Sequence, residues 1–127
     1  MANSEFKLKA EHIQRQDKTP VTIFYLQGWL EAQSESSLLT AAQDAHKNGT
    51  RHLVIHMEDL SMLTSAGIRA LQKVYKLFSM TDAGVETMHM KMCSAPPQVC
   101  HALSVTGMLS SVPMYENLQS ALRSFDQ

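Results

Sequence analysis

The chain has 127 residues, of which 44% are hydrophobic and 18% charged, a composition typical of one soluble globular domain spanning residues 1–127. The formal net charge of -1 argues against nucleic acid as the main partner, because nucleic acid favours a basic surface. No stretch approaches the ~18 apolar residues of a membrane span, and the N-terminus lacks the apolar core of a signal peptide. We therefore expect a cytoplasmic protein without direct membrane insertion.

The first half of the chain predicts two strands, a helix and a third strand. Alternating apolar and charged residues predict a half-exposed strand over 5–15, and β-branched and aromatic residues predict a second over 21–26. Capping-type residues at 34–36 open a helix with an apolar stripe, which Asn48-Gly49 closes. A short apolar run over 52–57 then predicts a buried strand.

The second half alternates helices with strands. Apolar stripes, prolines and caps predict helices over 66–80, 97–105 and 118–125, and strands over 88–92 and 112–115. Strands that alternate with helices imply right-handed parallel crossovers. We therefore predict an α/β class: a single domain with a mostly parallel mixed sheet of about five strands and about four helices.

The segment from Glu58 to Ile68, between the third strand and the following helix, carries the strongest candidate site. Thr64 and Ser65 stand where the strand gives way to the helix. A hydroxyl at such a position can cap orphan backbone N–H groups. It can also carry a phosphate into the positive end of the helix dipole. Both interpretations remain open for both residues, whereas the adjacent carboxylates Glu58 and Asp59 are interpreted as turn-capping groups.

The same segment resembles the phosphorylation loop of STAS domains. In bacterial anti-sigma factor antagonists of that class, the loop typically reads Asp-Leu-Ser, two further residues, then Asp-Ser-Ser/Thr-Gly. By this resemblance, Ser65 falls on the serine that a partner anti-sigma kinase phosphorylates, and Gly67 falls on the glycine of the motif. Two positions depart from the motif, since Thr64 replaces the aspartate and Ala66 replaces the second hydroxyl residue.

The resemblance extends over most of the chain, with its pieces in the family's order. Gly28-Trp29-Leu30-Glu31 is similar to a Gly-x-Leu-Asp turn that follows the family's second strand. The segment from Leu103 to Met108 resembles a Leu-x-x-Thr-Gly-Leu helix end. Tyr115-Glu116-Asn117-Leu118 resembles the family's passage from the final strand into the final helix.

The resemblance implies a partner-switching regulator that is not an enzyme and needs no cofactor. Such a protein binds an anti-sigma factor with serine kinase activity, and phosphorylation ends the binding. The implied phosphorylation site is Ser65, with Thr64 as the alternative. The predicted partner surface consists of Leu60, Met62, Leu63, Thr64, Ser65, Gly67 and Arg69. Because the motif's aspartate is missing, we expect slow or absent phosphorylation of Ser65.

Two other functions stay open. A STAS accessory subunit that binds a transporter ATPase in lipid trafficking is the main alternative, because some such subunits also depart from the phosphorylation motif. A small-molecule sensor is a weaker one, with its ligand against the methionine-bearing strand at 88–92. For Arg69, Lys73 and Lys76, a solvated helix face is favoured over a basic binding edge.

Metal chemistry finds no support in the spacing of potential ligands. His52 and His56 are separated by ~13 Å of strand rise, which is too far for one ion. Cys93 and Cys100 match neither a CxxC redox pair nor a zinc half-site, so we interpret them as free thiols. The sequence therefore predicts no metal site.

Overall fold

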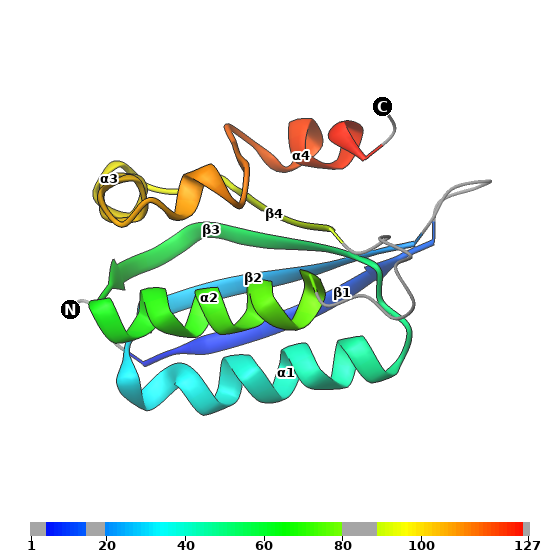
Figure 1. Cartoon of the computed structure of the whole chain (residues 1–127), viewed down its shortest axis with the longest axis horizontal. Helices are drawn as coiled ribbons and strands as arrows, with labels where there is room; N and C mark the ends of the chain where they lie inside the picture. Colours follow the sequence, from blue (N-terminus) through cyan, green and yellow to red (C-terminus); the bar gives the residue numbers. More distant parts are fainter. Residues whose placement is uncertain (1–4, 15–19, 80–88, 126–127) are drawn as a thin grey trace.

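The computed structural model describes residues 5–14, 20–79 and 89–125 (Figure 1). Its elements in chain order are β1 (Lys7–Ile13), β2 (Val21–Leu30), η1 (Ala32–Ser34), α1 (Glu35–Lys47), β3 (His52–Leu63), α2 (Ser65–Ser79), β4 (His89–Cys93), α3 (Pro97–Val105), η2 (Met108–Ser110), β5 (Met114–Tyr115) and α4 (Leu118–Ser124). The five strands and four α-helices confirm the predicted α/β class. The predicted helix end at residue 80 and strand start at residue 88 lie outside the described residues.

The strands lie in one sheet in the order β1-β2-β3-β4-β5. β1 is antiparallel to β2, and every other neighbouring pair is parallel. Buried residues of α1, α2 and α3 belong to one core cluster, whereas Ala121 of α4 belongs to another. In Figure 1, β4 and β3 lie between α4 at the top and α2, and α1 lies at the bottom. None of the helices in the described ranges has the length and apolar character needed to cross a bilayer.

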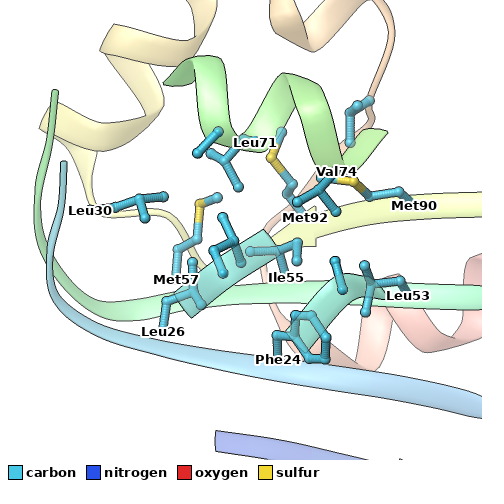
Figure 2. Close-up of a cluster of buried hydrophobic side chains, with 14 of the residues drawn as sticks. Phe24, Leu26, Leu30, Leu53, Ile55, Met57, Leu71, Val74, Met90 and Met92 are labelled. Atoms are coloured by element: carbon cyan, nitrogen blue, oxygen red, sulfur yellow. The ribbon is translucent and has the colours of Figure 1, made fainter. Parts of the chain in front are cut away.

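The main core lies between the sheet and the helices α1 to α3. Figure 2 shows side chains of β2, β3 and β4 directed toward Leu71 and Val74 of α2. Met57, Met90 and Met92 are part of this cluster and are at most 4% exposed. Their flexible side chains fill the space between strands and helix, which is core packing rather than the lining of a ligand pocket.

Two strands run further than their sequence pattern indicates. β2 continues to Leu30 and β3 to Leu63, because the two extensions pair with each other in parallel. Gly28 permits this by taking a φ of +87°, and the register shifts on either side of it. Glu58 and Asp59 are therefore exposed strand residues beside that irregularity, and their interpretation as turn caps was wrong.

The last strand is shorter than predicted, because β5 covers only Met114–Tyr115. Pro113 has no N–H group and can join the ladder only through its carbonyl, which accepts from the Met92 N–H at 3.0 Å.

The residues that end α1 and α3 and begin α4 lie where the sequence predicted them. Gly49 and Gly107 take positive φ after α1 and α3, and the Asn117 side chain accepts from the Ser120 N–H at 2.8 Å.

A lysine holds α4 against the second face of the sheet. The Lys91 ammonium on β4 donates to the Ser124 hydroxyl at 2.6 Å and lies 4.3 Å from the centre of the Phe125 ring. It also lies 5.5 Å from the Tyr115 ring centre. With these contacts, α4 packs on the part of this face formed by β4 and β5.

The part of the same face around Lys9, Glu11 and Tyr25 is open, whereas Val21 and Ile23 on β2 are buried. An open hollow there is lined by residues that include Lys9, Glu11 and Tyr25. The Tyr25 hydroxyl donates to Oε1 of Glu11 at 2.6 Å, and its ring contacts His56 with centres 5.0 Å apart. The hydrogen bond to Glu11, with a smaller contribution from burial, raises the pKa of Tyr25 to about 12.

This shift predicts a loss of stability in strong base. An unfolded chain ionises its tyrosines near pH ~10, whereas folded Tyr25 ionises at about 12. The contribution of the Glu11–Tyr25 hydrogen bond to the free energy of unfolding is therefore fully present below pH ~10. It disappears as the pH rises toward the pKa of folded Tyr25. A phenolate absorbance titration should show one late step that Tyr25→Phe removes and Glu11→Ala moves toward the ordinary value. A wild-type titration without a late step would contradict this.

Candidate docking site at the start of helix α2

The site is built where β3 meets α2. β3 ends at Leu63, α2 begins at Ser65, and Thr64 connects them. The Thr64 N–H donates to the Leu30 carbonyl at 3.1 Å, and its hydroxyl donates to the same oxygen at 3.3 Å. Thr64 therefore ties the start of α2 to the end of β2.

The same threonine caps the helix. The Gly67 N–H donates to Oγ1 of Thr64 at 3.2 Å, and the Ile68 N–H donates to the Thr64 carbonyl at 2.9 Å. A hydroxyl that accepts from the third helical N–H is the usual N-cap arrangement. Of the two hydroxyl residues that the sequence left as alternatives, Thr64 performs the capping.

Ser65 is left with an exposed hydroxyl at the first position of α2. This hydroxyl has no hydrogen-bond partner within the described residues, and neither do the N–H groups of Ser65 and Ala66. The first turn of α2 carries no acidic side chain. An added negative group on Ser65 would therefore meet unbonded amide donors and the positive end of the helix dipole.

Gly67 allows α2 to begin in contact with β2. A Cβ atom at this position would lie 2.2 Å from the Leu30 carbonyl oxygen and 3.0 Å from Cδ1 of Leu63. Real Cβ atoms do not approach a backbone oxygen so closely, so no larger residue fits without displacement of the helix. The Leu30 carbonyl thus contacts both Thr64 and Gly67, a role that sequence reasoning missed because Leu30 was placed in a turn.

Serines connect the neighbouring chain segments around this point. Ser61 donates from Oγ to the Gly28 carbonyl at 3.1 Å, and Ser34 donates to the Trp29 carbonyl at 2.8 Å. The start of α1 is further linked to the middle of α2 by an ion pair between Glu35 and Lys73. These contacts make the end of β2 and the start of both helices one connected platform.

The seven predicted partner-binding residues divide into surface and interior. Met62 is 40% exposed, Ser65 and Arg69 are exposed, and Leu63 and Thr64 are half-buried. Leu60, only 1% exposed, and Gly67 are buried, so neither offers a side chain to a partner in this structure. Their buried position corrects the expectation of direct contact, because both support the surface from below. We call Met62, Leu63, Thr64, Ser65 and Arg69 the docking surface.

Other candidate groups are not assembled into a site. In the described part of the chain, no three His, Cys, Asp or Glu side chains gather at a distance suited to a metal ion. Cys93 is buried, which raises the pKa of its thiol, and both cysteines are free. Lys73 is engaged by Glu35 and does not extend a basic edge from Arg69.

The comparisons agree with this fold. A model of the STAS domain family matches residues 12–121, so the chain belongs to the STAS domain family. A crystal structure of an anti-sigma factor antagonist from Mycobacterium paratuberculosis is similar, with a TM-score of 0.75, 19% identity, and coverage of 95% of this chain and 96% of that one. TM1081 from Thermotoga maritima gives a TM-score of 0.77, with 16% identity and coverage of 93% and 95%. The anti-sigma factor antagonist SpoIIAA in its unphosphorylated form gives 0.66, with 11% identity and coverage of 93% and 96%.

Proposed function

We propose that this chain is a non-catalytic partner-switching regulator of the anti-sigma antagonist type, acting in the cytoplasm. It binds an anti-sigma factor with serine kinase activity through the docking surface, and phosphorylation of Ser65 ends the complex. The single observation that carries the proposal is the exposed Ser65 hydroxyl at the start of α2, next to a neighbouring residue that already caps the helix. Ser65 is therefore available for modification at no cost to the helix.

The surface around Ser65 suits a protein partner. Met62 offers an exposed apolar side chain and Arg69 a charged one, a combination common in protein interfaces. Chemistry by Ser65 itself lacks support, because no base lies within hydrogen-bond reach of its hydroxyl among the described residues. The arrangement therefore supports recognition and regulated release rather than catalysis.

Phosphorylation would act on the interface more than on the fold. A phosphate at Ser65 adds about two negative charges, which the start of α2 tolerates because of its dipole and unbonded N–H groups. In a complex, the same charges would be buried against the partner next to Met62 and would have to lose their hydration. Release follows from that desolvation cost.

The test uses Ser65 variants and a kinase-type anti-sigma factor from the same organism. We expect Ser65→Ala to bind the partner like the wild type, and Ser65→Glu to raise the Kd by about tenfold or more. Isothermal titration calorimetry measures both. Gln119→Glu is the matched control, since it adds the same charge to the exposed first turn of α4, on the other face of the sheet.

Three results would contradict the proposal. One is equal affinity of Ser65→Glu and wild type, and another is an equal loss for Gln119→Glu. The third is binding to a transporter ATPase with no affinity for the anti-sigma factor, which would favour the accessory-subunit function instead.

A further inference from the structure

β1 forms one edge of the sheet. Among the described strands it pairs only with β2, and all seven of its residues take part in that pairing. The side of β1 that faces away from β2 keeps backbone N–H and C=O groups available to another strand. Beside this edge, Phe6 and Leu8 share a cleft with residues of α1, namely Ser36, Ser37, Thr40, Ala41 and Asp44.

β1 carries opposite charges two residues apart on the open face of the sheet. Lys9 and Glu11 are both exposed, and strand alternation places them on the same face as Tyr25. Lys9 has no ion-pair or hydrogen-bond partner among the described residues. Glu11 is held in place because its Oε1 accepts from the Tyr25 hydroxyl, which leaves Oε2 for a further donor.

Symmetry limits how this strand can meet its own copy. A two-fold axis perpendicular to the sheet keeps each face of the two sheets continuous only when one residue of β1 lies directly opposite its own copy, with the axis midway between them. If that residue is Ala10, all seven residues of β1 find a partner, and Lys9 of each copy lies opposite Glu11 of the other. If that residue is Leu8, Lys7 of each copy lies opposite Lys9 of the other, and fewer residues pair.

We propose that β1 is a self-association edge, on which two copies of this chain pair antiparallel about Ala10 into one continuous sheet. Backbone hydrogen bonds between the two strands supply the attraction. The two Lys9–Glu11 contacts across the symmetry axis select the register. Charged side chains, lysine above all, commonly protect an edge strand from pairing, but in this register Lys9 and Glu11 of the two copies complement each other.

This association goes beyond the proposed partner binding and uses other residues. The docking surface lies at the end of β3 and the start of α2, whereas the proposed pairing uses only β1. Partner affinity and self-association are therefore measured on separate variants. A variant that loses self-association can therefore still be tested for partner binding, and a variant that loses partner binding can still be tested for self-association.

The test exchanges charges on β1 and measures mass by sedimentation equilibrium. We expect the wild type to dimerise with rising concentration, more weakly at high salt. Lys9→Glu places carboxylates opposite each other and Glu11→Lys places ammonium groups opposite each other, so each variant alone should have a dimer Kd raised at least about tenfold. An equimolar mixture of the two variants restores both complementary contacts and should form a heterodimer. Arg123→Glu, at an exposed residue of α4, is the control for the charge change and should dimerise normally.

Hydrogen exchange adds the location of the contact. New protection on dimerisation should appear in 7–13 and not in the start of α2. A wild type that stays monomeric at millimolar concentration overturns the proposal. So does a dimer that Lys9→Glu leaves intact, or a mixture of the two variants that stays monomeric while each remains folded by circular dichroism.

Discussion

Replacing Gly67 with alanine is expected to lower the free energy of unfolding by about 3 kcal/mol. Alanine normally stabilises a helix interior relative to glycine by about 1 kcal/mol, so the expected change has the opposite sign. The reason is the Leu30 carbonyl, which would lie 2.2 Å from the new methyl group. Urea denaturation of the wild type and Gly67→Ala measures the difference.

Gly49→Ala separates steric overlap from backbone conformation. Gly49 has a φ of +93° but no atom within 4 Å of an added Cβ, so its substitution involves only the conformational strain. That strain amounts to about 1–2 kcal/mol. Leu63→Ala added to Gly67→Ala should not restore stability, because the obstacle is a backbone oxygen rather than the Leu63 side chain. Wild-type stability of Gly67→Ala would show that α2 can shift away from β2.

The features that were predicted correctly from the sequence depend on neighbouring residues. Asn48-Gly49 ends α1 because glycine takes the positive φ, and Asn117 begins α4 because its side chain accepts from the Ser120 N–H. Such capping preferences depend on residues a few positions apart, so they can be recognised in the sequence without knowledge of the rest of the fold. The order of strands and helices could be predicted for the same reason.

The misplaced features depend on contacts between segments distant in sequence. The extension of β2 beyond Gly28 is stabilised by β3, some thirty residues later, and no local pattern reveals that pairing. The burial of Leu60 and Gly67 follows from the same pairing. The division of roles between Thr64 and Ser65 required the position of the Leu30 carbonyl. The sequence identified Lys9 and Glu11 as charged residues of a strand, but it could not predict that this strand lies at the edge of the sheet.

Thr64→Asp is expected to raise the rate of Ser65 phosphorylation by the cognate kinase by about tenfold or more, from a slow wild-type rate. The family motif places an aspartate at this position, next to the serine that receives the phosphate. Thr64 supplies a cap to the Gly67 N–H, as an aspartate would, but it lacks the charge. Its hydroxyl also donates to the Leu30 carbonyl, which a carboxylate cannot do. The substitution therefore adds a charge beside Ser65, keeps the helix cap and removes one donor.

Thr64 itself is expected to be a poor phosphate acceptor. Its side chain is half-buried, and its oxygen is engaged by the Gly67 N–H while its proton is directed to the Leu30 carbonyl. Phosphate on this oxygen would remove the donor and crowd the cap, which contributes about 1 kcal/mol to stability. Ser65→Ala should consequently abolish phosphorylation rather than divert it to Thr64, and tandem mass spectrometry locates the modified residue.

Thr64→Asn is the control that distinguishes charge from capping. Asparagine caps helices as well as aspartate does but is neutral. If the charge orients the serine or its kinase, Thr64→Asn should be phosphorylated as slowly as the wild type, while Thr64→Asp is fast. Rapid, stoichiometric modification of wild-type Ser65, with no gain in Thr64→Asp, would show that the missing aspartate is irrelevant. The capping hydroxyl of Thr64 would then be sufficient to present Ser65 to the kinase.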